Sequence, residues 1–433
     1  MEKKIALKMI WKTGLTLLSG GAAGLLLLLL VYLIPTEPMI RNARSSVDIF
    51  REEGASAQVT HGYASTTLDN YTDAWMLRNA FYNGEESAWQ KCLHVYYYGY
   101  MDGQIDGVCE SMIAWLEGKE GYERLSYARY WHGYLTVLKP LLYFFDYGDI
   151  RGILKFIELA IFACLCVLLE RRHMTGVIPM LVAAMICVEF HVIGMSMQFS
   201  WVFIIAGLAC IAILKWYPKS GEAPETGLFF LGIGMLTSYF DFLTYPVFTL
   251  GIPLLLLTLC MRTSGKAGRI LHLPCMAVKH SIFWAIGYAG MWAQKWILYT
   301  IFTGDDLIAD GIRSVLLRSG RDVMGEQRGY LAAVGKNIAV MSKYPYLLVC
   351  AAAVVVLFVM RKKAERSSFS AGAFVAYLYI AALPFGWYMI SVNHSYIHSF
   401  MTYRGLGVTV FAMLAVVWEL LNGKKARCRD GKR

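Results

Sequence analysis

Ten long runs of apolar residues constrain the fold of this chain more than any other feature. An α-helix needs about 20 consecutive apolar residues to cross the hydrocarbon core of a bilayer. Of the 433 residues, 57% are hydrophobic and 17% are charged, whereas ordinary soluble domains are roughly 45–50% apolar and about 25% charged. We therefore predict an all-α polytopic membrane protein with about ten transmembrane helices, over residues 14–34, 150–170, 175–193, 199–216, 227–242, 245–261, 280–302, 346–360, 371–391 and 404–421.

The positions of Lys and Arg predict the orientation of these spans. The first run follows four lysines and has no small-residue cleavage site close behind it, so we interpret it as an uncleaved anchor. Basic loops stay in the cytoplasm, and every short basic patch falls on that side if the N-terminus is inside. The sequence thus predicts a multi-pass plasma-membrane protein with both termini in the cytoplasm. This topology accounts for the net charge of +10, and we expect no nucleic-acid partner.

The predicted topology divides the chain into five parts. They are a cytoplasmic start with the first span (1–34), a long outer loop (35–149), spans two to seven (150–302), a second outer loop (303–345), and spans eight to ten with a basic cytoplasmic tail (346–433). The first outer loop is rich in Tyr and Trp, which is typical of helices at a membrane interface. Its stretch 134–145 is apolar but too short to span, so we expect an interfacial helix there, with Arg129, His132 and Lys139 directed toward the lipid headgroups.

Cys92 and Cys109 are the only cysteines in the two predicted outer loops. Disulfides persist in exported segments and are rare in the cytoplasm. The sequence therefore predicts a possible disulfide between these two residues, with a pair of free thiols as the alternative. Cysteines within the apolar runs, such as Cys187 and Cys350, are interpreted as small apolar residues.

Two carboxylates stand four residues apart in the first outer loop, at Asp69 and Asp73. On a helix this spacing places both side chains on one face. A general base must be held close to its substrate, at the edge of a dry cavity, so each aspartate is a candidate base. The alternative is helix capping by Thr67, Asp69 or Thr72, with Asp73 as an acidic residue in the first turn.

Further charged residues are predicted at the same outer level of the membrane. Charged groups inside a bilayer are costly, and they usually line a cavity or pair with one another. Asp241 and Glu189, at the outer ends of two spans, are therefore candidate cavity residues. Lys295 lies about two helical turns below the outer end of its span, where it is a candidate phosphate ligand.

Candidate phosphate ligands also occur in the two later outer loops. His394, His398 and Arg404 can donate charge-assisted hydrogen bonds to an oxyanion. The spacing of the two histidines also suits a metal on a helix, but no acidic residue accompanies them, so we predict no metal site, and a requirement for a divalent cation stays open. A planar guanidinium matches phosphate, and the second outer loop offers four: Arg313, Arg318, Arg321 and Arg328.

Taken together, the features above resemble the GT-C superfamily of membrane glycosyltransferases. The shared features are an uncleaved first span, a long first outer loop with an acidic motif, interfacial helices before the second span, and a polar final outer loop. The segments 68–74 (LDNYTDA), 129–134 (RYWHGY) and 394–398 (HSYIH) resemble a poorly characterised bacterial branch of that superfamily. The resemblance implies that the catalytic base is an acidic residue of the first outer loop, Asp69 first and Asp73 second. It also implies a sugar donor carried on a polyprenyl phosphate or diphosphate.

The expected function is transfer of a sugar from such a donor to a cell-surface glycan, lipid or protein acceptor. Inversion is expected, because one base without a covalent intermediate gives direct displacement. The expected phosphate ligands are Arg129, His132, Lys139, Lys295, His394, His398 and Arg404. Two other classes stay open: a lipid-linked polysaccharide polymerase or ligase, in which the second outer loop dominates, and a lipid or solute transporter, which usually has two related halves.

Overall fold

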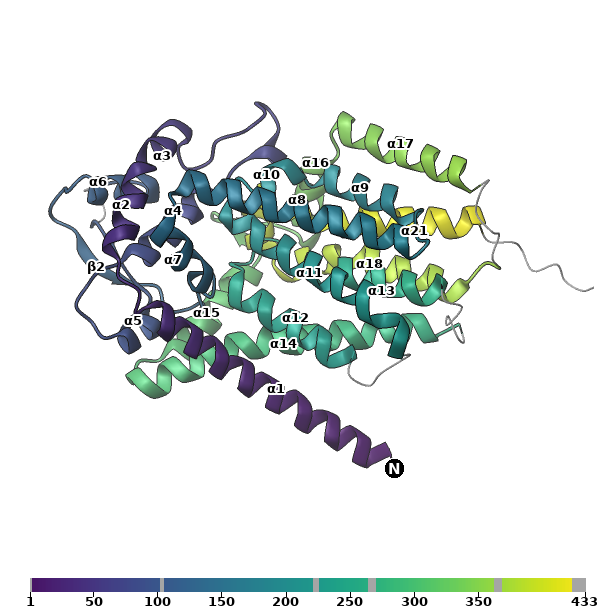
Figure 1. Ribbon diagram of the computed structural model, residues 1–433, viewed down its shortest axis with the longest axis horizontal. Coiled ribbons are helices and arrows are strands. Elements are labelled where there is room, and N and C mark those ends of the chain that lie inside the picture. Colours follow the sequence, from purple (N-terminus) through teal and green to yellow (C-terminus); the bar gives the residue numbers. More distant parts are fainter. Residues whose placement is uncertain (1, 102–104, 221–225, 264–269, 362–367, 423–433) are drawn as a thin grey trace, which may run out of the picture.

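Helices make up almost all of the secondary structure of this chain. The computed structural model describes residues 2–101, 105–220, 226–263, 270–361 and 368–422 (Figure 1). A long first helix is followed by a segment of short helices and one antiparallel pair of strands, which lies at one end of the molecule in Figure 1. Its elements are α2 (Glu37–Ser45), α3 (Val47–Glu53), η1 (Ala64–Thr66), α4 (Asn70–Phe81), α5 (Ala88–His94), β1 (Tyr96–Gly99), α6 (Val108–Leu116), β2 (Glu123–Ser126) and α7 (Leu135–Phe144).

The remaining helices form a bundle that runs away from the α2–α7 segment. The N-terminal end of α1 and the C-terminal end of α21 both lie toward the opposite end of the molecule (Figure 1). The elements of the bundle and its connections are α1 (Glu2–Val31), α8 (Tyr147–Arg171), α9 (Val177–Cys187), α10 (Phe190–Ile193), α11 (Met197–Ser220), α12 (Thr226–Phe240), α13 (Val247–Thr263), α14 (His272–Thr303), α15 (Leu307–Ser319), β3 (Asp322–Val323), β4 (Glu326–Gln327), α16 (Tyr330–Met341), α17 (Tyr344–Met360), α18 (Ala371–Ile390), α19 (Val392–Ile397), α20 (Ser399–Thr402), η2 (Tyr403–Gly405) and α21 (Leu406–Asn422).

Nine of the ten predicted apolar runs each fall mainly in one helix, and the run 175–193 is divided between α9 and α10. Not every one of these helices has the length and composition of a span. In the described part of the chain, a sixth span exists only if α16 and α17, bent by 78° at their junction, count as one. The protein is therefore an all-α, membrane-embedded protein with five or six such helices, fewer than the ten predicted. The five helices that qualify alone are Ala6–Val31, Tyr147–Arg171, Met197–Trp216, Ala371–Ile390 and Ser399–Asn422.

Close helix packing in the bundle depends on glycine. A Cβ at Gly234 of α12 would lie 2.1 Å from the carbonyl oxygen of Trp284 on α14, and a Cβ at Gly287 would lie 2.1 Å from that of Leu231. Larger side chains at these positions would push the two backbones apart. Small residues serve this purpose in membrane helices, where the lipid supplies no hydrophobic force between helices.

Capping side chains fix where several helices begin. Asp146 accepts the backbone N–H of Asp149 at the start of α8, and Asp306 accepts that of Ala309 at the start of α15. Ser87 and Gln90 form a reciprocal capping box on α5. These caps satisfy N–H groups that a helix leaves without internal partners, so the polar ends of α8 and α15 are set at the boundary between the bundle and the α2–α7 segment.

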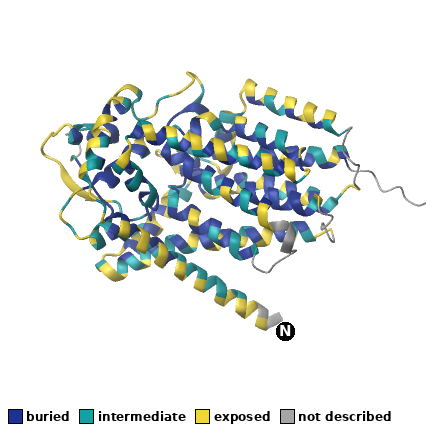
Figure 2. Ribbon diagram, viewed as in Figure 1, coloured by how far each residue is buried: buried dark blue, intermediate teal, exposed yellow. Residues whose placement is uncertain are grey.

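The molecule has two large apolar cores. One lies within the bundle and includes Phe199, Phe248 and Phe411. The other joins the α2–α7 segment to α1 and α8 through residues such as Leu77 and Leu135. Buried residues run through the bundle while α17 and the first half of α1 are largely exposed (Figure 2). The α2–α7 segment is thus packed against the bundle, and the polar residues discussed next lie where the two meet.

Candidate functional site

Asp69 begins helix α4 instead of sharing a helical face with Asp73. Its backbone has non-helical φ and ψ angles, and its carboxylate accepts the backbone N–H of Thr72 at 3.1 Å. Its own N–H donates to the Ser196 hydroxyl at 2.9 Å, which ties the start of α4 to the start of α11. The prediction of a capping residue is therefore confirmed for Asp69. Because Asp69 precedes the first helical residue, the condition for a helical face shared with Asp73 is not met.

The Asp69 side chain also lines a cavity of about 690 Å³ at the junction of the α2–α7 segment and the bundle. Seven Tyr, Trp and Phe side chains form much of its wall, and Arg318, His394 and His398 also line it. A cavity with aromatic walls and a few convergent polar groups is the usual form of a ligand site. The lining residues are Ala55, Ser56, Asp69, Tyr71, Thr72, Trp75, Tyr97, Tyr127, Tyr130, Gln198, Phe242, Arg318, His394, His398, Phe400 and Met401.

A second, smaller hollow of about 310 Å³ adjoins the first, because Arg318, His394 and His398 line both. This hollow is rich in arginine. Its wall consists of Arg129, Asp310, Arg313, Ser314, Leu317, Arg318, Asn393, His394 and His398. The larger cavity contains the carboxylate of Asp69, and the smaller hollow contains three guanidinium groups and the carboxylate of Asp310. Arg318 and the two histidines line both spaces.

The arginines of the smaller hollow differ in how they are held. Arg129 donates from Nε and Nη2 to the two carboxylate oxygens of Asp310, at 2.8 and 3.1 Å. Arg318 donates to the Ser314 hydroxyl and lies over the ring of Tyr130, 5.7 Å from its centroid. Arg129 is therefore already neutralised by a carboxylate, whereas Arg318 makes a neutral contact and keeps its charge for an anion.

The two histidines face each other with ring centroids 4.7 Å apart. The Nε2–H of His394 is oriented to donate to the carbonyl oxygen of Leu243 at 2.8 Å, which leaves Nδ1 as an acceptor. Burial lowers the pKa of His394 to about 3 and that of His398 to about 4, so both rings are neutral at pH 7. Within the described ranges, no three His, Cys, Asp or Glu side chains gather closely enough to hold a metal ion.

Burial also sets the proton affinity of Asp69. It raises the pKa of this carboxyl above its ordinary value, while the hydrogen bonds from Thr72 and the charge of Arg404 partly oppose the rise. A carboxylate with a raised pKa removes a proton more effectively than one that is fully stabilised as an anion. The position at a cavity wall and the direction of this pKa shift together are those of a general base.

Asp73 has different surroundings, although it is only one turn further along α4. Its carboxylate accepts the Tyr147 hydroxyl at 2.6 Å and the backbone N–H groups of Met197 and Gln198 at 2.8 and 3.0 Å. It is fully buried and does not line the cavity. Asp73 therefore caps the N-terminus of α11, a position that favours negative charge.

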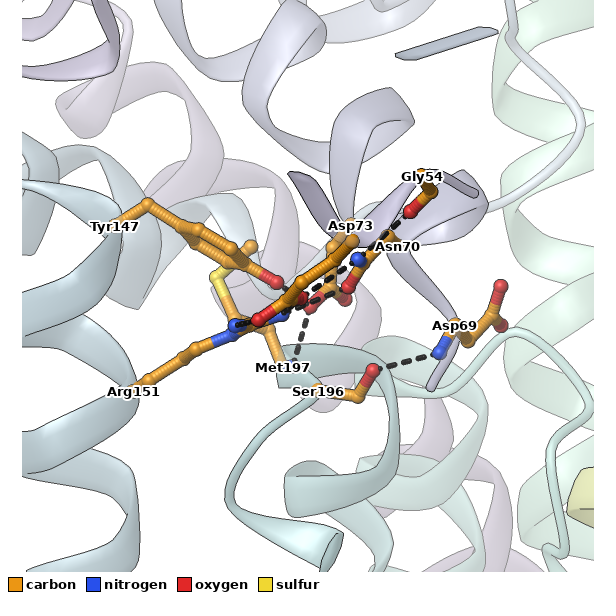
Figure 3. A network of polar contacts seen from close by, with 9 residues as sticks. Gly54, Asp69, Asn70, Asp73, Tyr147, Arg151, Ser196 and Met197 are labelled. Carbon is orange, nitrogen blue, oxygen red and sulfur yellow. Dashed lines mark hydrogen bonds and ion pairs between the residues drawn. The ribbon is translucent and has the colours of Figure 1, made fainter. Parts of the chain in front are cut away.

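The Asp73 cluster continues into a set of charged and amide groups that connects α3, α4 and α8 (Figure 3). Arg151 donates to both carboxylate oxygens of Glu53 at 2.8 Å and to the Asn70 side-chain oxygen at 2.7 Å. Asn70 in turn donates to the Gly54 carbonyl at 2.9 Å. Figure 3 shows the Asp69 carboxyl pointing away from this cluster, so the cluster fixes the start of α4 while Asp69 remains directed elsewhere.

Four of the predicted phosphate ligands are buried against carbonyl groups and do not line either space. This was not foreseen, since sequence shows a charge but not its partner. Lys139, expected at headgroup level, donates to the Ala80 carbonyl at 2.6 Å, and His132 Nε2 lies 2.6 Å from the Tyr127 carbonyl. Lys295 donates to the carbonyls of Cys92 and Leu93 at 3.1 and 2.8 Å, and Arg404 to those of Phe400 and Ser65, both at 3.1 Å.

Asp241 and Glu189 also lie outside both spaces. Asp241 accepts the backbone N–H and the hydroxyl of Thr244, which closes the turn between α12 and α13. Glu189 accepts the hydroxyl of Tyr346 and lies 3.2 Å from His191. Their carboxylates are therefore used within the protein and were misassigned to the cavity.

The disulfide predicted between Cys92 and Cys109 does not form, and both are free, buried thiols. The Cys92 sulfur contacts the Leu25 carbonyl at 3.9 Å, and the Cys109 sulfur contacts the Asn70 carbonyl at 3.5 Å. The two residues lie on α5 and α6 and make separate contacts, so the free-thiol alternative is the one that the structure has.

Sequence reasoning missed Gln198 as a cavity residue. Its side chain is almost fully buried, it lines the cavity, and its Oε1 has no hydrogen-bond partner among the described residues. A buried acceptor without a partner is costly, so a donor in the cavity would stabilise it. The sequence signal was the position of Gln198 at the polar start of a long apolar run, directly after the short loop that contains Ser196.

Comparisons with known proteins give no relative from which a function could be inferred. No family model, curated protein or solved structure matches the chain. The cavity and the residues around it are therefore the features that indicate a function.

Proposed function

We propose that this protein is a membrane glycosyltransferase of the GT-C type, which transfers a sugar from a polyprenyl-phosphate donor to a glycan, lipid or protein acceptor. One observation carries the proposal: the carboxyl of Asp69 and the guanidinium of Arg318 line the same cavity, which has aromatic walls. A sugar ring packs on aromatic faces, a phosphate binds a guanidinium, and an acceptor hydroxyl needs a base.

In the proposed reaction, Asp69 removes the proton of the acceptor hydroxyl as its oxygen attacks the anomeric carbon. The bond between that carbon and the phosphate oxygen breaks, and the electron pair leaves with the phosphate. Arg318 stabilises the departing anion, and the neutral ring of His398 can donate one N–H to it. The single N–H of His394 is already donated to the Leu243 carbonyl. A single displacement of this kind inverts the anomeric configuration.

Asp73 is assigned a positioning role in this proposal. Its carboxylate is occupied by three donors from α8 and α11, so it holds the start of α4 in place. Asp69 is thus the proposed base, and Asp73, the second candidate from the sequence, is not retained as a base.

The proposal includes the ten-span topology in the plasma membrane, with both termini in the cytoplasm and the cavity on the outer side. The α2–α7 segment lies at the end of the bundle opposite the N-terminal end of α1 and the C-terminal end of α21 (Figure 1), which supports it. In this arrangement, α14 and the shorter apolar helices Val177–Cys187, Thr226–Phe240 and Val247–Thr263 cross the membrane together with the helices of spanning length.

The test is sugar transfer by the purified full-length protein in lipid nanodiscs, with a panel of radiolabelled polyprenyl-phosphate sugars. We expect transfer, or slow hydrolysis, of one donor. Arg318→Gln should lower kcat/KM about 10- to 100-fold, since a hydrogen bond to a charged group contributes about 1.5–3 kcal/mol. The control Arg321→Gln changes an arginine of the same loop that lines neither space and should leave the rate unchanged.

Two outcomes would contradict the proposal. A well-folded protein that uses no donor in a broad panel would favour the polymerase or transporter alternatives. Equal activity of the wild type and Arg318→Gln would remove Arg318 from the phosphate site even if transfer itself is observed.

A further inference from the structure

Two cysteines that are far apart in the sequence face each other in the bundle. The sulfur atoms of Cys187 and Cys350 lie 3.8 Å apart, although 163 residues separate them. Cys187 is the last residue of α9, and Cys350 lies in the second turn of α17. Both are free thiols; Cys187 is buried and Cys350 is partly exposed. The interpretation of these cysteines as small apolar residues does not explain why their two thiols are in contact.

A modest movement of α17 would bring this pair to bonding distance. Sulfur atoms in a disulfide are about 2.05 Å apart, and each side chain must take a suitable rotamer. Helix α17 lies at the edge of the bundle, and its residues Leu347, Leu348 and Val355 are at least half exposed (Figure 2). A peripheral helix of this kind can shift at lower cost than one inside the close-packed core.

The contact partners of α17 connect this pair to the cavity. Tyr346, one turn before Cys350, shares a hydrogen bond of 2.6 Å with the Ser65 hydroxyl and donates to Glu189. The carbonyl of Ser65 also accepts from Arg404 at 3.1 Å. Ser65 lies four residues before Asp69, so α17 braces the loop that leads into the start of α4.

We propose that Cys187 and Cys350 form a redox-active pair, and that their disulfide fixes α17 against α9 and thereby stabilises the loop before Asp69. The pair follows from the geometry of the thiols and does not depend on the proposed glycosyltransferase activity. Oxidation would convert a brace held by hydrogen bonds into one held by a covalent bond.

The proposed reaction is a thiol–disulfide exchange between these cysteines and a small external disulfide, which acts as the oxidant. The more accessible Cys350, as its thiolate, attacks one sulfur of the oxidant, forms a mixed disulfide and releases one thiolate. Cys187 then loses its proton and attacks the Cys350 sulfur, which releases the second thiolate. The protein loses two protons and two electrons, and the oxidant is reduced to two thiols.

The experiment treats the full-length protein in detergent with 4,4′-dipyridyl disulfide, a small apolar disulfide. Remaining thiols are then alkylated, and proteolytic peptides are analysed by mass spectrometry without reduction. We expect one linked peptide pair that contains Cys187 and Cys350 and that disappears after reduction. Oxidation should also raise the Tm of the wild type, because the cross-link restricts the unfolded chain.

Three cysteine variants test whether the disulfide forms between Cys187 and Cys350. Cys187→Ser should stop at a mixed disulfide on Cys350, because the second step has lost its nucleophile, and its Tm should not rise. Cys350→Ser should give no linked pair. Cys92→Ser, which removes a buried thiol outside the pair, should form the linked pair as the wild type does.

The proposal is overturned if the wild type retains both thiols in alkylated form, or if its Cys350 stops at the mixed disulfide. It is also overturned if the linked pair forms but the Tm does not change, since the disulfide would then fix nothing. None of these outcomes bears on sugar transfer, which is measured separately.

Discussion

Replacement of Asp73 tests the positioning role of its carboxylate. Asp73→Ala removes the acceptor for the Tyr147 hydroxyl and for two backbone N–H groups at the start of α11. Each hydrogen bond to a charged group contributes about 1.5–3 kcal/mol, but the three share one acceptor and are not additive. We therefore expect a loss of about 4 kcal/mol in the free energy of unfolding, within the range for breaking a buried polar network. Asp73→Asn keeps the shape and can satisfy two of the three donors, so we expect a loss of about 1–2 kcal/mol.

The assay is unfolding of the purified protein by titration with a denaturing detergent, followed by tryptophan fluorescence. The matched control is Asp48→Ala, which removes an acidic residue of α3 whose carboxylate is 79% exposed and pairs with Arg51. Exposed ion pairs contribute little, so this variant should behave as the wild type. The reasoning is refuted if Asp73→Ala is no less stable than Asp48→Ala.

Asp73, Gln198 and Lys295 each allow a further test. Burial raises the pKa of Asp73 to about 7 in the native state, above about 3.9 in the unfolded chain, so the native state holds a proton that the unfolded state releases. The contribution of this proton to the free energy of unfolding is full below about pH 4 and is lost as the pH rises to about 7. The free energy of unfolding of Asp73→Asn should therefore depend less on pH over this range than that of the wild type. Gln198→Leu removes a buried acceptor without a partner and should retain stability within about 1 kcal/mol but raise the KM for the sugar substrate; an unchanged KM would remove Gln198 from the site. Lys295→Met removes the ammonium group that donates to the carbonyls of Cys92 and Leu93 and should lower the free energy of unfolding by about 2 kcal/mol. The KM for the polyprenyl-phosphate sugar should not change. A rise in that KM without a loss of stability would instead support the role of Lys295 as a phosphate ligand.

The helices of the bundle were predictable because apolar runs in a membrane protein must become helices that satisfy their own backbone. The short apolar stretch 134–145 also gave a helix, α7 (Leu135–Phe144). The number of spans was less accessible. Helix α14 begins at His272, eight residues before the predicted run, and its mixed polar and apolar surface does not by itself mark a span.

The cavity was predictable only in part. The acidic motif and the two histidines were identified by residue type, and three of these side chains, Asp69, His394 and His398, line one cavity. The distinction between Asp69 and Asp73 was not accessible, because it depends on contacts more than 120 residues away in the sequence. The backbone N–H of Asp69 donates to Ser196, just before α11, whereas the carboxylate of Asp73 accepts from Met197 in α11.

The buried cations show why charge alone misled the sequence analysis. Lys139 and Lys295 are typical phosphate ligands by composition, yet each binds backbone carbonyls that no local pattern reveals. Arg318 was one of four equivalent arginines in the sequence. Its position at both spaces follows from the placement of α15 (Leu307–Ser319) beside α19, a tertiary contact that spacing along the chain does not encode.

The most direct test of the central claim is the sugar-transfer rate of Asp69→Asn. Asparagine is an equally good N-cap, so the hydrogen bond from Thr72 and the fold should be kept, which gel filtration and detergent titration can verify. Loss of the base should lower kcat about 100-fold, as expected for a general base. A folded Asp69→Asn variant that transfers sugar at the wild-type rate would contradict the assignment of Asp69 as the catalytic base.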